Sequence, residues 1–346
     1  MTDAPVAVTR STGGWIPLAA VIVSVVLWST TYGLSAIALV SASPAVLSEL
    51  RLVLSVPLLL ALILFLRPSR GAAALRRALR QPRSALLALT GVALFYLPSN
   101  IGLTLSTAGT ASLMSASLPV LTALIAWWVI RERISGRIGL GLALVTVGVG
   151  IGSAGVVELG LGAALLVAGL ASYALYTVLL RRTGAAADPR AETGTSDPLV
   201  LATATAVWGA VLLLPWLWWE LATGAASWPT GAPAWLSVAF LALIVTGPTM
   251  ALYSYGAERV PATVAGTATG AVPALGYAFA VLLGEPLIAL KAAGAALTVV
   301  GVLIAAAPAR QRPAVIRPRA SVPEPQRETA VPQRETAVPQ KEGAAP

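Results

Sequence analysis

The sequence predicts an all-α polytopic membrane protein with ten transmembrane helices arranged as two inverted five-helix repeats. Three observations support this fold class: the composition, ten apolar segments of membrane-spanning length, and an internal duplication. Of the 346 residues, 57% are apolar and only 11% are charged. Because about a quarter of the residues of a soluble globular protein are charged, this chain is not expected to be water-soluble.

The ten apolar segments are the predicted transmembrane helices. A hydrocarbon core of about 30 Å requires roughly 20 mostly apolar helical residues. Segments of this kind lie at 16–38, 45–66, 84–105, 108–130, 135–154, 158–180, 198–219, 236–257, 262–283 and 288–307. The apolar stretch of the first is too long for a signal peptide, so we expect it to be a helix of the mature protein.

The distribution of basic residues predicts the orientation, because Lys and Arg in short loops remain on the cytoplasmic side. With both termini inside, the outer loops contain only Lys291, and Arg51 lies within a span. The inner segments contain the basic tail and Arg10, Arg67, Arg70, Arg76, Arg77, Arg80, Arg83, Arg131, Arg133, Arg137, Arg181, Arg182, Arg190 and Arg259. This asymmetry accounts for the net charge of +9 without a nucleic-acid partner. Abundant Arg, Ala and Gly suggest a bacterial protein of the inner membrane.

Comparison of the chain with itself shows a duplication. At an offset of 154 residues, Pro44 pairs with Pro198 and Pro119 with Pro273, and the same offset pairs Ala108 and Ala111 with Ala262 and Ala265. One residue away from this offset, Glu132 pairs with Glu285 and Gly148 with Gly301. The predicted divisions are an N-terminus at 1–15, repeats at 16–154 and 155–307, and a disordered cytoplasmic tail at 308–346, in which PQRETAV occurs twice.

Five spans in each half force the second half to enter the membrane from the opposite side. Inverted repeats of this kind are typical of secondary transporters, whose substrates bind near the bilayer midplane between the halves.

These residues carry a family resemblance. The chain resembles the EamA type of the drug/metabolite transporter superfamily over about residues 16–307, through LWSTTYG in the first span, Arg51, and the series from Ala108 to Glu132 with its copy from Ala262 to Glu285. The resemblance implies export of metabolites, amino acids or drugs, commonly driven by an ion gradient. One departure is Thr205, which stands where Arg51 stands in the first repeat.

The chain contains no His and no Cys, so we expect no metal site, no cofactor and no enzymatic activity. An intramembrane enzyme would need positioned acids, bases or metal ligands that this sequence scarcely provides. No Walker-type loop is present, which argues against nucleotide-driven transport.

Prolines predict interruptions of the fourth and ninth helices. Pro119 and Pro273 are expected near the helix centres, where each frees the carbonyl four residues earlier, at Ser115 and Thr269. Free carbonyls at membrane depth are tolerated against protein or a water-lined cavity. A simple kink and a cavity wall both fit this pattern.

The small residues Gly266 and Gly270 favour close helix packing over ligand contact.

Polar side chains within the spans are the candidate substrate-binding residues. Asn100 is the only Asn of the chain, and both ligand binding and an interhelical hydrogen bond fit it. All seven tyrosines lie in predicted spans, although Tyr255 fits a membrane interface. The other candidates for an amphipathic pocket are Ser29, Tyr32, Tyr96, Ser115, Ser172, Tyr173, Tyr176, Thr249, Tyr253, Thr269 and Tyr277.

Glu49 and Arg51 are the ionisable residues clearly inside a span, and charged groups at such depth usually have functional roles. Arg51 is a candidate to hold a substrate carboxylate, and Glu49 to carry a coupling proton. Alternatively, both side chains could snorkel to the outer headgroups. For Glu132 and Glu285, at the ends of the fourth and ninth helices, we favour an anchoring role with Arg131, Arg133 and Lys291.

The predicted function is secondary active export of an amino acid or an amphipathic drug-like solute by alternating access. A passive channel or facilitator is the alternative. The expected partners are the small-molecule substrate, the lipid bilayer and a coupling proton or ion, and the sequence leaves a homo-oligomer open.

Overall fold

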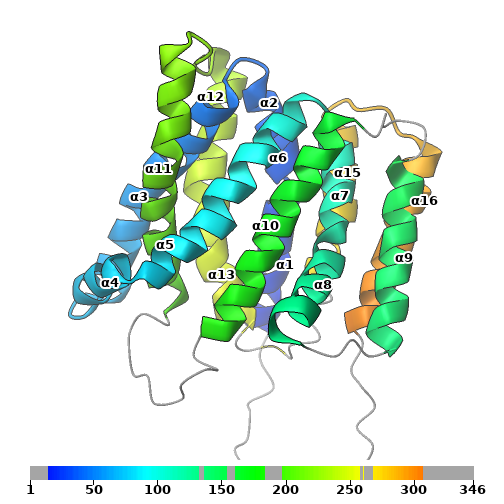
Figure 1. The fold of residues 1–346 in the computed structure, drawn as a ribbon, viewed down its shortest axis with the longest axis horizontal. Coiled ribbons are helices and arrows are strands. Elements are labelled where there is room, and N and C mark those ends of the chain that lie inside the picture. Colours follow the sequence, from blue (N-terminus) through cyan, green and yellow to red (C-terminus); the bar gives the residue numbers. More distant parts are fainter. Residues whose placement is uncertain are drawn as a thin grey trace, which may run out of the picture. The chain divides into compact units, whose positions relative to one another are not determined.

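The computed structural model describes residues 15–131, 136–153, 160–183, 197–257, 260 and 268–306. Every regular element in these ranges is helical (Figure 1). The helices of the first repeat are α1 (Trp15–Ser29), α2 (Thr31–Leu39), α3 (Pro44–Leu66), α4 (Gly71–Arg80), α5 (Pro82–Ala88), η1 (Leu89–Ala93), α6 (Leu94–Thr104), α7 (Ala108–Met114), η2 (Ser115–Ser117), α8 (Leu118–Ile130) and α9 (Gly136–Ser153). Those of the second are α10 (Leu161–Thr183), α11 (Pro198–Ala222), α12 (Gly231–Phe240), η4 (Leu241–Thr246), α13 (Pro248–Ala257), α15 (Val272–Leu282) and α16 (Ala289–Ala306).

Several of these helices join end to end into membrane-spanning rods. Seven described segments are long and apolar enough to cross a bilayer: Trp15–Leu39, Pro44–Leu66, Pro82–Thr104, Ala108–Val129, Leu161–Leu180, Pro198–Ala222 and Gly231–Met250. Three shorter apolar helices, Gly136–Gly152, Val272–Leu282 and Ala289–Ile304, coincide with the other predicted spans. The chain is therefore a multi-pass membrane protein, and the count of ten spans stays a prediction.

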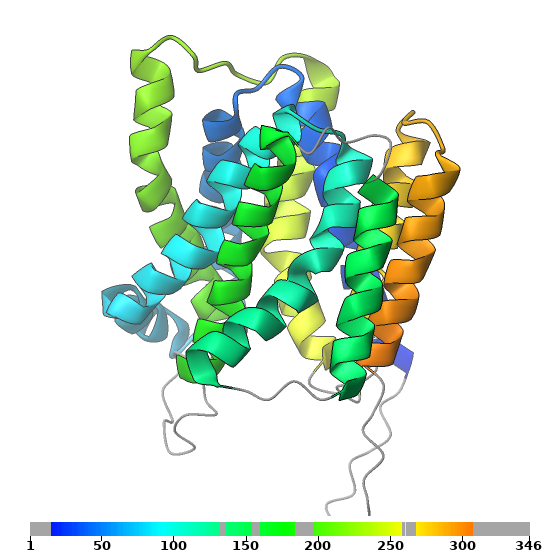
Figure 2. The ribbon, with the colours of Figure 1, turned by 45° about the vertical axis from the view of Figure 1, so that its right-hand side comes forward.

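The predicted N-terminal segment and tail, together with Glu132, Arg133, Ala262, Ala265 and Gly266, lie outside the described residues. The start of α1 and the end of α16 lie at the same end of the helix bundle (Figures 1 and 2). We call this the termini end. The distal end is the opposite one, where α2 leads into α3 and α11 leads into α12.

Equivalent helices of the two repeats pack against each other in opposite directions. The second spans, α3 and α11, contact at both ends: Ala45 meets Glu220 at the distal end, and Arg67 meets Asp197 at the other. Because Ala45 begins α3 whereas Glu220 ends α11, the two helices are antiparallel. This arrangement agrees with the inversion that the odd number of spans predicts.

The fifth spans, α9 and α16, form a second antiparallel pair of equivalent helices through glycines. A Cβ atom on Gly294 would lie 2.5 Å from the carbonyl oxygen of Gly148, and one on Gly301 would lie 2.7 Å from that of Gly141. Lipid tails are as apolar as leucine side chains, so helices in a membrane associate through such close packing. The glycine pattern is thus what holds this pair together.

The third spans also use equivalent glycines. Gly102 of α6 packs against the carbonyl oxygen of Gly162 in α10, and Gly256 of α13 packs against that of Pro17 in α1. In each repeat the third span therefore contacts the first span of the other repeat. This exchange of partners is what a two-fold relation between the halves produces.

Pro119 lies near the centre of the Ala108–Val129 span, as expected, and both prolines follow an interruption and stand in the first turn of the helix after it. Pro119 is the second residue of α8, which follows the 3-10 turn η2, and Pro273 is the second residue of α15. Proline has no backbone N–H, and the first turn is where a helix needs none. The interruptions thus precede the prolines, at Ser115–Ser117 and Gly270–Ala271.

Two features were not predicted from the sequence. The third span of each repeat contains a π-helical segment, η1 in the first and η4 in the second. A π-turn closes i→i+5 hydrogen bonds, so it holds one residue more than an α-helical turn and displaces the carbonyl groups, and such segments are frequent at functional sites. The other feature is α4, an amphipathic helix in a segment that lies outside the predicted spans.

Replacing Gly294 by Ala is predicted to destabilise the α9–α16 pair by about 1–3 kcal/mol, because the added methyl group meets backbone atoms that have no room to move. Thermal unfolding of the purified protein in detergent should show a lower midpoint for Gly294→Ala. Gly139→Ala is the matched control on α9, since a Cβ atom there has nothing within 4 Å. Equal midpoints for both variants would contradict this account of the packing.

Candidate functional site

A buried arginine lies between the two repeats. Arg51 in α3 is 8% exposed, and its Nε donates a hydrogen bond of 3.0 Å to Thr246 Oγ1 of η4. Its guanidinium carbon is 5.0 Å from the centre of the Tyr96 ring in α6, a cation–π distance. Among the described residues it forms no ion pair with a carboxylate. A cation held by a hydroxyl and a ring retains the capacity to bind an anion.

Aromatic rings extend from Arg51 into the second repeat. The ring centres of Phe95 and Tyr96 are 5.7 Å apart, those of Phe95 and Tyr173 are 5.1 Å apart, and those of Tyr173 and Tyr176 are 5.2 Å apart. We call these four residues the aromatic cluster. Its two halves come from α6 and α10, the third span of one repeat and the first span of the other.

Two further predicted residues lie close enough for long-range electrostatic effects on this group. Tyr32 of α2 is within such range of Arg51, and Tyr253 of α13 is within such range of Tyr173. The Tyr253 ring also packs against Trp28, with ring centres 4.8 Å apart. The structure therefore brings together Tyr32, Arg51, Tyr96, Tyr173, Tyr176 and Tyr253 from our predicted set.

The π-helical segment η1 borders the aromatic cluster, and η4 borders Arg51. In η1, Gly91 leaves room for the Tyr176 ring, since a Cβ atom there would lie 2.6 Å from Tyr176 Cδ2. The neighbouring Thr90 carbonyl accepts a hydrogen bond of 2.8 Å from Ser172. In η4, Thr246 supplies the hydroxyl that accepts from Arg51. The irregular backbone of both repeats thus positions the residues around Arg51.

Asn100 forms a hydrogen bond between helices. Its Nδ2 donates to Ser48 Oγ of α3 over 2.8 Å, and both residues are buried. This contact fits the interhelical alternative that the sequence left open. A role in substrate binding stays a prediction.

The remaining predicted hydroxyls bond to their own helices. Ser29 donates to the carbonyl of Val26, Ser115 to that of Ser112, and Thr249 to that of Ile244. Thr269 lies just before α15. In the described part of the chain, no contact places Ser29, Ser115 or Thr249 against the aromatic cluster, and the predicted binding roles of all four residues remain untested.

Glu49 is buried in α3, two residues before Arg51. It is 4% exposed, and in the described part of the chain neither carboxyl oxygen has a hydrogen-bond partner. A snorkelling side chain would reach the surface, so this burial does not fit the headgroup alternative. A buried carboxyl group without a partner is costly as an anion, and uptake of a proton removes that cost.

At the distal end, a carboxylate from the second repeat binds the start of α3 in the first. Glu220 accepts hydrogen bonds from Ser43 Oγ over 2.5 Å and from the backbone N–H of Ala45 over 3.1 Å. It is 4% exposed. A carboxylate at a helix N-terminus satisfies free N–H groups and complements the helix dipole.

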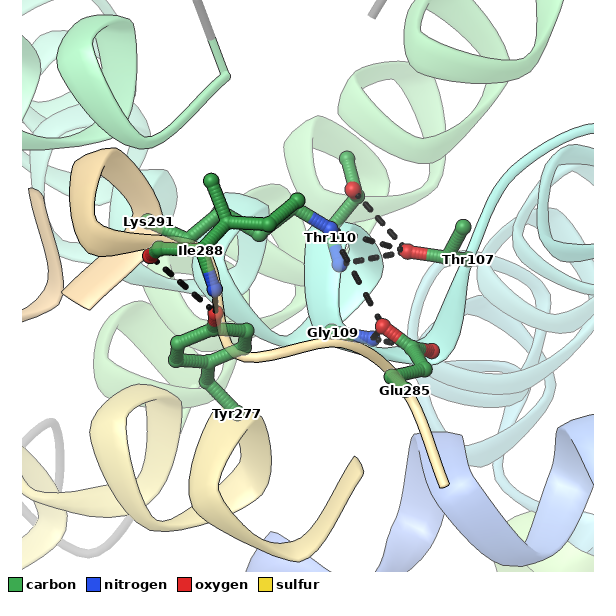
Figure 3. Close-up of polar contacts among 7 residues, drawn as sticks. All are labelled: Thr107, Gly109, Thr110, Tyr277, Glu285, Ile288 and Lys291. Carbon is green, nitrogen blue, oxygen red and sulfur yellow. Dashed lines mark hydrogen bonds and ion pairs between the residues drawn. The ribbon is translucent and has the colours of Figure 1, made fainter. Parts of the chain in front are cut away.

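A second carboxylate does the same for α7 (Figure 3). Both oxygens of Glu285 accept from the backbone N–H of Gly109, at 3.0 and 3.2 Å. Lys291 lies 3.9 Å from Glu285 and donates to Thr107 Oγ1 over 3.3 Å. The hydroxyl of Tyr277 accepts from the N–H of Ile288 over 3.0 Å.

Two of the residues in Figure 3 lie in positions that differ from those expected from the sequence. Lys291, expected in an outer loop, is in the first turn of α16 and 2% exposed. Tyr277 joins this distal group rather than the aromatic cluster. The anchoring role expected for Glu285 agrees with its contacts. Together, the Glu220 and Glu285 contacts tie the two repeats at the distal end.

Sequence reasoning missed Glu220, Ser48, Thr246 and Phe95 as members of these groups. Glu220 carried a signal, because it is a single carboxylate at the end of an apolar, Trp-rich span. The hydroxyl residues carried none, since Ser and Thr are common in these helices and their partners are distant in sequence.

Comparison with known proteins gives two findings. A model of the EamA-like transporter family matches residues 15–153 and again residues 160–307. A solved structure titled "Crystal structure of protein" matches with a TM-score of 0.61 and 19% sequence identity, and the match covers 84% of this chain and 96% of that chain. At this identity the likeness concerns the fold alone. No curated protein matches the chain.

Removing the Glu220 carboxylate is predicted to open the distal end more often. The chain has no cysteine, so Ala45→Cys provides a single reactive thiol at a position that is fully buried. Loss of two hydrogen bonds to a charged group should raise its labelling rate by an impermeant maleimide about tenfold in a Glu220→Ala background. Thr223→Ala, which removes two hydrogen bonds to backbone carbonyls at the end of α11 and leaves the Glu220 carboxylate in place, is the control. Unchanged labelling in Glu220→Ala would show that this contact does not close the distal end.

Proposed function

The chain belongs to the EamA-like transporter family, and we propose that it is a secondary active transporter that exports a small metabolite by alternating access. That the chain is a membrane transporter follows from the family match over both repeats and from its apolar helices. The solute, the direction of transport, the driving force and the full set of ten spans are parts of the proposal.

The observation that carries the proposal is a buried arginine that has no carboxylate partner among the described residues and lies beside a cluster of aromatic rings. Burying a guanidinium group in a membrane costs free energy, so a buried arginine within a span usually has a functional role. Arg51 is suited to a carboxylate, and the rings of Tyr96, Phe95 and Tyr173 are suited to an apolar or aromatic group. An amino acid or an amphipathic drug-like acid has both features.

The antiparallel pairing of equivalent helices supports alternating access. Two like halves in opposite orientation can form inward-open and outward-open states of similar free energy. The Glu220 and Glu285 contacts join the halves at the distal end. Breaking them is the local event that would admit solute from that side.

We propose that Glu49 couples transport to a proton gradient. It lies about one-half turn from Arg51 on the same helix, buried and without a hydrogen-bond partner among the described residues. A group in this position can exchange its proton as the surrounding helices move. No nucleotide or other cofactor is needed for such a cycle.

We place the protein in a bacterial inner membrane with the termini end in the cytoplasm. Arg70, Arg76, Arg77 and Arg80 lie at that end of the bundle, which supports this orientation by the positive-inside rule (Figure 1).

Solute counterflow in proteoliposomes tests the function. The solutes are labelled aromatic, branched and small polar amino acids and a cationic dye. Exchange of one class, with accumulation against its gradient when a pH gradient is imposed, is expected. Downhill flux of every solute without counterflow would favour the alternative, a passive channel or facilitator.

Arg51→Gln is predicted to weaken binding of a carboxylate solute by about ten- to a hundredfold, the loss typical of a charge-assisted hydrogen bond. Half-saturating concentrations for the acid and for its methyl ester measure this effect, and the ester should change little. Arg70→Gln, which alters an exposed arginine outside the Arg51 contacts, is the control. An equal loss for acid and ester would show that Arg51 does not bind the carboxylate.

Glu49→Gln is predicted to retain counterflow and to lose accumulation driven by a pH gradient, because the amide cannot carry a proton. Glu49→Asp, which keeps an ionisable group, should restore part of the accumulation. Full pH-driven accumulation by Glu49→Gln would exclude this residue as the proton carrier.

A further inference from the structure

The termini end contains an arginine-lined hollow next to an apolar one. α4 is a ten-residue helix beside α3, α5 and α11 (Figures 1 and 2). Its inner face buries Leu75 and Ala78, whereas Arg76, Arg77 and Arg80 are exposed. Such a helix, apolar on one face and basic on the other, is suited to the boundary between the acyl chains and the headgroups.

The position of α4 is fixed by the bundle. Leu75 and Ala78 belong to a core with Leu59, Ile63 and Leu199. The indole N–H of Trp208 in α11 donates to the carbonyl of Leu79 over 3.0 Å. The arginines are therefore presented by a docked helix, and their spacing is preorganised.

The first hollow measures about 370 Å³ and is lined by Ala73, Arg76, Arg77, Arg80 and Gln81. No acidic residue occurs in the sequence between Glu49 and Glu132. Among the described residues, the carboxylate that forms an ion pair at this end is Asp197. Its partner is Arg67, which does not line the hollow. Three arginines thus line one space, a setting that favours a phosphate group.

The second hollow measures about 310 Å³ and is almost entirely apolar. Its walls include Leu60, Ile63, Ala72 and Leu75, and Arg76 lines both hollows. A ligand that fills the two spaces must join an anionic group to a hydrocarbon chain at Arg76.

We propose that these hollows form a binding site for an anionic phospholipid, with the phosphate among Arg76, Arg77 and Arg80 and part of an acyl chain between α3 and α4. Basic clusters next to transmembrane helices attract anionic lipids. Because Arg76 lines both hollows, the site requires a ligand that carries an anionic headgroup and an acyl chain in one molecule. Attraction by surface charge alone would not require the chain. The site is separate from Arg51 and the aromatic cluster, so transport assays of the proposed function and lipid binding can fail independently.

The test is titration of the delipidated protein with dihexanoyl phosphatidylglycerol, followed by native mass spectrometry. Saturable binding of one lipid is expected. Dihexanoyl phosphatidylcholine, which has no net charge, and glycerol phosphate, which has no chains, should each bind at least about tenfold more weakly. Equal binding of the two lipids would overturn the proposal. Glycerol phosphate binding as tightly as the lipid would reveal a site for free phosphate instead.

Substitutions distinguish a specific binding site from general attraction by the positive charge of this surface. Arg76→Gln combined with Arg80→Gln should weaken phosphatidylglycerol binding at least about tenfold. The control pair Arg70→Gln and Arg131→Gln removes the same charge from exposed positions outside the hollow. Equal weakening by both pairs would contradict the site.

A substitution in the apolar hollow tests the proposed position of the acyl chain. Ala72→Phe fills that space from an exposed position, so it should weaken lipid binding and leave glycerol phosphate unaffected. Undiminished lipid binding by this variant would contradict the proposed chain position.

Discussion

The antiparallel packing of equivalent helices is the constraint on which the rest of this structure depends. In a bilayer the hydrophobic effect does not drive helices together, so each contact needs close backbone approach or a polar bond. The α9–α16 pair uses close approach, through Gly148, Gly294 and Gly301. The α3–α11 pair uses polar contacts at both ends, through Glu220 and Asp197.

This packing also explains where the candidate site lies. Arg51 is on α3, one member of the central antiparallel pair, and its contacts come from the third spans of both repeats, Tyr96 in the first and Thr246 in the second. The π-helical segments occur in those same spans, and they place Gly91 and Thr246 against the site. A substrate at Arg51 would therefore contact both halves, as alternating access requires.

Much of the fold could be predicted from the sequence because membrane-spanning helices have a strong signal. The described helices follow the predicted apolar segments, and the offset that pairs Pro44 with Pro198 corresponds to the starts of α3 and α11. The resemblance noted in the sequence is confirmed by the family match. The amphipathic helix α4 was missed because its ten residues are short and Arg-rich, and the π-helical segments leave no compositional signal.

The site was only partly predictable. Residue type identified Arg51, Tyr96 and Tyr173, since charged and aromatic groups stand out in an apolar span. The partners depend on how helices cross, which is why Thr246 and Ser48 were not foreseen. Tyr277 was expected with the other tyrosines, but its position next to the α15–α16 connection joins it to Ile288 at the distal end.

The central claim is that the two repeats move against each other between two states. The most direct measurement is the distance between spin labels at Val40→Cys and Leu287→Cys, both exposed at the distal end and in different repeats, in the otherwise cysteine-free chain. Double electron–electron resonance in liposomes should show two separated distance populations whose ratio changes when a solute that undergoes counterflow is added. A single distance distribution that no transported solute alters would contradict alternating access between these halves.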